Sequence, residues 1–150
     1  MILTQAVITL GGKGSRLKSI TNEKPKVLYP IFGKSCLDYS FENLYNYGFK
    51  KLHFLLYNNH EEILENINSN LKKYPFEFTF SIEKEPKGEA GGLLDSEKLL
   101  DDNFLFINGD LIWDIDLKKF SEFHFYKNSD ITFLTHATNH PEDSDVIIEN

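Results

Sequence analysis

The sequence predicts an α/β fold in which a mostly parallel sheet carries helices on both faces. Short apolar runs of strand length alternate along the chain with segments whose apolar residues recur at helical spacing. This alternation is typical of parallel sheets whose strands are connected by helices. Glycine and polar residues also directly follow two of the apolar runs, at residues 4–10 and 104–107. Because open α/β sheets bind ligands at the carboxyl ends of their strands, these two positions are candidate binding sites.

The first elements are a strand, a helix and a second strand. Residues 4–10 are mostly apolar and predict a buried strand. Ser35 and Asp38 have the spacing of a capping box, which predicts a helix that begins beside Cys36 and is stopped at Gly48. Residues 52–57 predict the next strand, because they are again mostly apolar.

The rest of the chain continues the alternation. We expect helices at residues 60–72, 91–100 and 116–127, and strands at residues 76–82, 104–107 and 131–135, with one more strand beginning at 146–148. Apolar and polar residues alternate at 76–82, which predicts a half-buried strand. A chain that stops inside an apparent strand leaves backbone and apolar groups uncovered. We therefore expect residues 1–150 to be the C-terminally truncated front part of a single longer domain, with no second domain in this chain.

Composition and charge exclude several classes of function. The formal net charge is −7, so a broad basic surface for nucleic acid is not expected. Five of the 16 basic residues nevertheless lie within residues 13–26. A charge run alone is more often a solvated loop, but a local patch can bind a small anion against the sign of the net charge, and the glycines beside this run favour that interpretation.

Cysteine usage and hydropathy indicate the compartment. Cys36 is the only cysteine, which excludes an internal disulfide and a cysteine-based zinc site. Its apolar neighbours predict a small buried side chain rather than a nucleophile. The amino terminus lacks the features of a secretion signal, and no run of 18 apolar residues is present. We therefore expect a reducing, cytoplasmic setting.

A glycine-rich segment, Gly11-Gly12-Lys13-Gly14-Ser15-Arg16, directly follows the first predicted strand. Glycines allow backbone N–H groups to approach phosphate oxygens, and lysine and arginine supply positive charge. Leu17 stands where the dinucleotide-binding fingerprint has its third glycine, and the Gly-Lys-Ser/Thr ending of a P-loop is absent. The segment predicts a polyphosphate-binding loop of a third kind. The alternative is a flexible connection between a strand and a helix.

Pro25 precedes a second candidate, Lys26. Proline fixes its own φ and favours an extended conformation for the residue before it. Lys26 therefore follows a stiff stretch of backbone, which suits a lysine that holds a phosphate. The alternative is an ordinary surface lysine after a turn.

The third candidate is Asp110, in the sequence Asn108-Gly109-Asp110 after the strand at residues 104–107. In a parallel sheet it would lie on the same edge as Gly11, where a carboxylate can hold Mg²⁺ beside phosphates. The alternative is a hairpin turn, for which Asn-Gly is a strong signal. Asp114 and Asp116 could assist, although Asp116 is better placed to cap the next helix.

Together these segments resemble the sugar-1-phosphate nucleotidyltransferases. The family signature is a Gly-Gly-x-Gly-Thr/Ser-Arg-Leu loop followed by a Pro-Lys pair. Residues 10–17, 25–26 and 108–110 match the family in order and spacing, and residues 140–145 resemble its guanylyltransferase-like branch. The resemblance extends over essentially all 150 residues and points to the mannose-1-phosphate and heptose-1-phosphate guanylyltransferases. It implies a Rossmann-like sheet of the nucleotide-diphospho-sugar transferase fold.

The resemblance also implies site residues. Arg16 and Lys26 would be the catalytic residues, on the phosphates of a nucleoside triphosphate, and Asp110 would bind Mg²⁺. Residues 83–92 resemble the family's base-recognition stretch, although Glu89 stands where that stretch usually has threonine. The nucleotide-binding residues would be Leu10, Gly11, Gly12, Gly14, Ser15, Glu85, Gly88 and Gly91. The family's second metal-binding aspartate and most of its sugar contacts would fall after Asn150.

The implied reaction is attack by a sugar 1-phosphate on the α-phosphorus of a nucleoside triphosphate, with release of pyrophosphate. GTP is favoured by resemblance, and neither nucleic acid nor a membrane is expected as a partner. The alternative is a nucleotide-binding regulatory or inactive module of the same fold. A nicotinamide-dependent oxidoreductase is disfavoured because the dinucleotide fingerprint fails.

Overall fold

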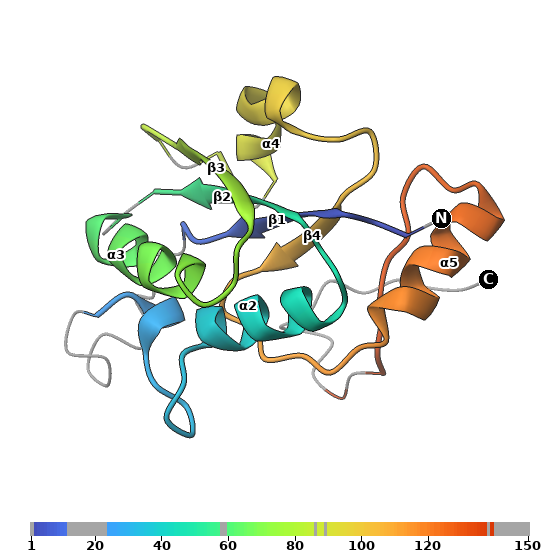
Figure 1. The fold of residues 1–150 in the computed structure, drawn as a ribbon. Helices are drawn as coiled ribbons and strands as arrows, with labels where there is room; N and C mark the ends of the chain where they lie inside the picture. Colours follow the sequence, from blue (N-terminus) through green and yellow to red (C-terminus); the bar gives the residue numbers. More distant parts are fainter. Residues whose placement is uncertain are drawn as a thin grey trace.

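A four-stranded parallel sheet forms the centre of the part of the molecule that the structure describes. The computed structural model describes residues 2–11, 24–57, 60–85, 87–88, 90–137 and 139. The strands are β1 (Gln5–Thr9), β2 (Lys51–Leu56), β3 (Glu77–Ile82) and β4 (Leu105–Asn108). Their spatial order is β3-β2-β1-β4 (Figure 1). The prediction of an α/β fold with a parallel sheet is confirmed.

Helices cover both faces of the sheet, as the sequence predicts. Figure 1 shows α2 (Cys36–Asn46) and α3 (His60–Leu71) on one face and α4 (Gly91–Ser96) on the other. The remaining elements are the single turns η2 (Lys26–Leu28) and η3 (Glu97–Leu99), and α5 (Leu117–Lys127). Among the helices that the structure describes, none combines the length and the apolar character needed to cross a membrane.

The two central strands are buried on both faces, which explains their nearly continuous apolar sequence. Ile8 of β1 and Phe54 of β2 belong to the core cluster beneath α2 and α3. Phe41 of α2 stacks on Phe54 with 5.9 Å between the ring centroids. The adjacent residues Val7 and His53 are also fully buried, and alternation along a strand places them on the opposite face. Solvent therefore reaches the edges of the sheet and not the faces of its central strands.

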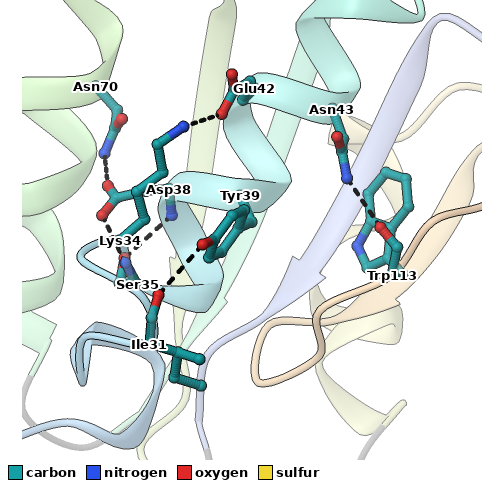
Figure 2. Close-up of polar contacts among 9 residues, drawn as sticks. All are labelled: Ile31, Lys34, Ser35, Asp38, Tyr39, Glu42, Asn43, Asn70 and Trp113. Atoms are coloured by element: carbon teal, nitrogen blue, oxygen red, sulfur yellow. Dashed lines mark hydrogen bonds and ion pairs between the residues drawn. The ribbon is translucent and has the colours of Figure 1, made fainter.

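The helix α2 begins where the capping box predicts. The Asp38 N–H donates to Ser35 Oγ (3.1 Å), and the Ser35 N–H donates to the Asp38 carboxylate (2.9 Å), as Figure 2 shows. Asn70 of α3 donates to the same carboxylate (2.7 Å). Burial acts to raise the pKa of Asp38, but these hydrogen bonds outweigh it and hold the pKa below its usual value. The helix ends at Asn46, and Gly48 follows with φ +81°, as the sequence predicts.

One predicted strand does not form, and a second forms with a burial pattern that differs from the prediction. Residues 131–135 are irregular, because a strand needs neighbouring backbone and none of the described strands pairs with this segment. β3 forms, but its apolar residues Phe78, Phe80 and Ile82 are exposed. The polar residues between them face α4 instead. The strand predicted at residues 146–148 lies outside the described residues.

Candidate active site at the carboxyl edge of the sheet

The ends of β1 and β4 meet at one edge of the sheet. The two strands are parallel neighbours in which Thr9 pairs with Asn108, so the residues that follow them, Gly11 and Asp110, leave the sheet side by side. The Gly109 N–H donates to the Thr9 carbonyl (2.9 Å), and the Thr9 hydroxyl donates to the Asn108 side-chain oxygen (3.1 Å). These contacts hold the backbone immediately before Asp110.

Gly109 fits this position because its backbone lies against β1. A Cβ atom at Gly109 would stand 2.4 Å from Leu10 Cδ2 and 2.6 Å from the Thr9 carbonyl oxygen, and both distances are far shorter than van der Waals contact. Only glycine allows this approach without displacement. The alternative of a hairpin at Asn108-Gly109 is excluded, because β4 pairs in parallel with β1 and residues 111–116 are irregular.

Lys26 reaches the same edge from η2. Pro25 precedes η2 with φ −54° and ψ 130°, and the Leu28 N–H donates to its carbonyl (2.9 Å). Val27 is buried in the core, which anchors the turn. The stiff backbone predicted before Lys26 is therefore a tight turn with one side chain held in the core.

Lys26 and Asp110 form an ion pair. Lys26 Nζ donates to Asp110 Oδ2 at 2.6 Å, and the two side chains are 40% and 36% exposed. The residues are 84 positions apart, so only the fold brings them together. An ion pair at this level of exposure adds little net stability, about 0–1 kcal/mol. Its charges are therefore accessible to a ligand at small energetic cost.

Cys36 lies beside this pair at the start of α2. Burial raises the pKa of its thiol first, and the Asp110 carboxylate raises it further. Cys36 is 4% exposed, and its thiol stays protonated at neutral pH. The prediction of a small buried side chain is confirmed, and both effects oppose a role as a nucleophile.

The segment after Asp110 is held by α2 and α5. Asn43 of α2 donates to the Trp113 carbonyl (3.0 Å), as Figure 2 shows. Asp116 accepts from the Lys119 N–H (3.0 Å) and is the N-cap of α5, as the sequence predicts. The backbone on each side of Asp110 is therefore tied to a neighbouring element.

The loop between β3 and α4 packs tightly on the first turn of α4. The Glu83 N–H donates to the Leu56 carbonyl (2.8 Å), which carries the β3 side of the loop to the end of β2. Gly88 has φ +83°, a conformation that favours glycine. A Cβ atom at Gly91 would lie 2.3 Å from Lys87 Cβ. Backbone conformation and close packing therefore explain why glycine stands at positions 88 and 91, apart from any contact with a ligand. Glu85, in the same loop, is exposed.

The remaining predicted site residues divide into two groups. Leu10 and Gly11 are described: the Leu10 side chain is buried in the core, and its N–H donates to the Leu55 carbonyl (2.8 Å). Gly11 lies close to β2, because a Cβ atom there would stand 3.1 Å from Tyr57 Cβ. The predicted phosphate-binding residues Gly12, Gly14, Ser15 and Arg16 lie outside the described residues.

Sequence reasoning missed a polar cluster around the buried His53. Its ring nitrogens lie 2.7 Å from Thr79 Oγ1 and 2.9 Å from Ser96 Oγ. A histidine in an otherwise apolar strand, together with hydroxyl residues at alternate positions of the next strand, was the available signal. That signal could not identify Ser96, because only the packing of α4 on the sheet brings the two residues together.

Asp110 is the one candidate metal ligand that the described site offers. No group of three or more histidine, cysteine or acidic residues is arranged to hold a metal ion in the described part of the chain. Magnesium usually keeps several waters and takes one or two carboxylates together with substrate phosphates. A single half-exposed carboxylate beside a lysine fits that pattern.

Fold and site together define an α/β protein with an exposed ionic site at the carboxyl edge of a parallel sheet. The sequence matches the nucleotidyl transferase family model over residues 5–146. The chain therefore belongs to the nucleotidyl transferase family, and the predicted resemblance is confirmed.

Individual relatives agree with this assignment. D-glycero-alpha-D-manno-heptose 1-phosphate guanylyltransferase of Campylobacter jejuni is 36% identical over 115 residues, which are 77% of this chain and 51% of the relative. Mannose-1-phosphate guanyltransferase of Yarrowia lipolytica is 31% identical, over 96% of this chain and 40% of the relative. UTP–glucose-1-phosphate uridylyltransferase AglF of Haloferax volcanii is 30% identical, over 93% and 57%. This chain thus spans about half the length of the curated relatives it matches.

A solved structure supports the same fold. The crystal structure of HddC from Yersinia pseudotuberculosis complexed with GMP-PN superimposes with a TM-score of 0.68 and 34% sequence identity, over 81% of this chain and 54% of that one. The nucleotide-diphospho-sugar transferase fold is therefore confirmed.

Proposed function

We propose that this chain is the nucleotide-binding portion of a single sugar-1-phosphate nucleotidyltransferase domain. It would transfer a nucleotidyl group from a nucleoside triphosphate to a sugar 1-phosphate, with release of pyrophosphate. The observation that carries the proposal is the Lys26–Asp110 pair at 2.6 Å. The fold places a cation and a carboxylate in contact beside Gly11, at the edge where open α/β sheets bind ligands.

The two charges of this pair suit two different ligands. Lys26 would bind a phosphate of the triphosphate, and Asp110 would hold Mg²⁺ together with phosphate oxygens and water. When bound, Mg²⁺ would offset negative charge on the phosphates. Because a half-exposed ion pair contributes so little, exchanging one partner for a phosphate and the other for a cation costs little.

The chain's own residues would act mainly by position and charge. An oxygen of the sugar 1-phosphate attacks the α-phosphorus, the bond to the β-phosphate oxygen breaks, and pyrophosphate leaves with the electron pair. Both substrates are anions at neutral pH, so the attacking oxygen needs no base. The barrier comes from bringing anions together. Lys26 and Arg16 would stabilise the charge that develops on the transferred and leaving phosphates.

Nucleotide contacts would come from two loops on this edge. Leu10, Gly11, Gly12, Gly14 and Ser15 would surround the phosphates, and Glu85, Gly88 and Gly91 would lie beside the base or ribose. GTP is the favoured triphosphate, because two of the relatives compared are named guanylyltransferases and the HddC structure is a complex with GMP-PN. A relative named as a uridylyltransferase is nearly as similar, so UTP is the first competitor to test.

The direct test is pyrophosphate release by the protein with MgCl₂. GTP, UTP, CTP, dTTP and ATP are each combined with mannose 1-phosphate, heptose 1-phosphate or glucose 1-phosphate. We expect release with at least one pair, at a rate that requires both substrates. Binding of a triphosphate without release would instead indicate the alternative, a regulatory or inactive module. If the protein neither binds a triphosphate nor releases pyrophosphate, the proposal is overturned.

A further inference from the structure

A buried histidine joins three elements on the α4 face of the sheet. His53 in β2 is 0% exposed. Its Nδ1 lies 2.7 Å from Thr79 Oγ1 of β3, and its Nε2 lies 2.9 Å from Ser96 Oγ of α4. Both ring nitrogens are therefore engaged by hydroxyl groups, and the proposed reaction uses none of these residues.

The hydrogen bonds form a directed chain. Burial lowers the pKa of His53, so the ring is neutral at neutral pH and has one N–H donor and one acceptor nitrogen. Ser96 has a single hydroxyl proton, and its Oγ lies 2.9 Å from the Gly92 carbonyl oxygen, to which it donates. When Ser96 donates there, Nε2–H must donate to Ser96 Oγ, and the Thr79 hydroxyl must donate to Nδ1. This series of hydrogen bonds then runs from Thr79 of β3 through His53 and Ser96 to the backbone of α4.

Ser96 attaches α4 to the sheet through polar contacts with β2 and β3. The helix has six residues, of which only Gly92 and Ser96 are buried. Leu94 is 83% exposed, so it contributes no burial. Ser96 Oγ also lies 2.9 Å from Ser81 Oγ of β3. A short helix with so little apolar packing depends on its buried hydrogen bonds for its position.

The first turn of α4 lies close to described residues of the loop that precedes it. A Cβ atom at Gly92 would stand 3.0 Å from Glu83 Oε1 and 3.2 Å from Leu55 Cδ1. A Cβ atom at Gly91 would stand 2.3 Å from Lys87 Cβ. Glu83 and Lys87 therefore lie against the first turn of α4, and a displaced helix would disturb both residues.

We propose that His53 is a positioning residue for nucleotide binding. By its contact with Ser96 it holds α4 against the sheet, and α4 in turn holds the loop that contains Glu85, Gly88 and Gly91. The inference rests on the proposed function, because it takes this loop to be the one that meets the base or ribose. His53 itself touches no substrate.

Two amide variants separate the two contacts of the ring. The side-chain amide of Gln reaches about as far as Nε2, so His53→Gln keeps a donor for Ser96 and loses the Thr79 contact. The amide of Asn reaches only about as far as Nδ1, so His53→Asn keeps Thr79 and loses Ser96. Thr79→Val and Ser96→Ala remove the same contacts from the partner side. Both amide variants leave a polar group in the same buried place, so general disruption would affect them alike.

Two measurements are made on each variant. Hydrogen exchange of amides 90–97 in the nucleotide-free protein reports on α4, with the amides of α2 as the internal reference. Isothermal titration with GTP, and in parallel with UTP, reports on nucleotide affinity. Loss of one buried hydrogen bond corresponds to about a tenfold change. We expect about tenfold faster exchange and about tenfold weaker binding in His53→Asn and Ser96→Ala, with both values within about twofold of wild type in His53→Gln and Thr79→Val.

The outcomes distinguish this inference from the proposed function. If the amides of α4 exchange in His53→Asn at the same rate as in the wild type, the inference is overturned, even if triphosphate binds normally. Faster exchange with unchanged affinity would overturn its link to the nucleotide. Equal effects in His53→Gln and His53→Asn would also overturn it, because the Ser96 contact would then not matter. A wild-type protein that binds neither GTP nor UTP would count against the proposed function, and the exchange experiment would still test the hold on α4.

Discussion

Two polar contacts on the same sheet differ in almost every physical respect. The Lys26–Asp110 pair is charged, and its side chains are 40% and 36% exposed. The His53–Ser96 contact is neutral, and both residues are 0% exposed. Water already competes for the first pair, so it can change partners at little cost. Breaking the His53–Ser96 contact leaves buried polar groups without partners, which costs far more. Exposed charge therefore suits ligand binding, and buried neutral contacts suit the positioning of backbone.

The largest expected effect comes from removing the carboxylate of the exposed pair. Asp110→Asn keeps the shape of the side chain but loses its charge, so we expect pyrophosphate release to fall about 100-fold or more. The unfolding free energy should change by less than about 0.5 kcal/mol, as for other surface substitutions. Rates and urea denaturation measured on the same preparation test both statements.

A second ion pair supplies the matched control. Lys51 and Asp101 lie 2.8 Å apart with side chains 43% and 35% exposed, but Lys51 begins β2 and so lies at the amino edge of the sheet. Asp101→Asn should leave the rate of release within about twofold of wild type. An equal loss in both variants would show that the position of the pair in the sheet is irrelevant.

The next effect tests what places Asp110. Gly109→Ala puts a methyl group 2.6 Å from the Thr9 carbonyl oxygen, where backbone must move to admit it. We expect a loss of about 2 kcal/mol in unfolding free energy, within the usual range for overpacking, measured by urea denaturation. A loss below about 0.5 kcal/mol would mean that the ends of β1 and β4 separate easily.

Replacing the cation of the pair should have a smaller effect than removing the carboxylate. Lys26→Met keeps much of the aliphatic side chain and would remove the charged hydrogen bond to phosphate that we propose, which corresponds to about a tenfold weaker binding of triphosphate. Titration calorimetry with GTP measures it. Lys51→Met is the matched control and should bind as wild type does; unchanged affinity in Lys26→Met would remove Lys26 from the phosphate site.

The smallest effect concerns the buried cluster and pH. The pKa of histidine in an unfolded chain is about 6.5, and burial lowers the pKa of His53 in the folded protein. Between those two pKa values the unfolded state binds more protons, so the contribution of His53 to stability is fully present above about 6.5 and is lost as the pH falls toward the folded pKa. His53→Gln cannot titrate. We expect the stability difference between wild type and His53→Gln to shift against wild type between pH 7.5 and 5.5, as measured by urea denaturation at each pH. A constant difference would contradict this.

Short-range patterns in the sequence predicted most of the elements. The capping box at Ser35, the stop at Gly48 and the cap at Asp116 depend on groups within a few residues of one another, so local chemistry determined them. The order of apolar runs determined the parallel sheet, and hence that Gly11 and Asp110 leave it at one edge. The resemblance of the motifs to a known family was likewise readable from the sequence.

Long-range contacts were decided by the tertiary structure alone. Residues 131–135 have the apolar composition of a strand but no pairing partner among the described strands, and the alternation in β3 did not reveal that its polar residues face α4. Lys26 meets Asp110 across 84 positions, and His53 meets Ser96 across 43. A sequence pattern records which residues are apolar or charged and how they are spaced. Which surface covers a side chain, and which distant group it touches, depends on how the elements pack.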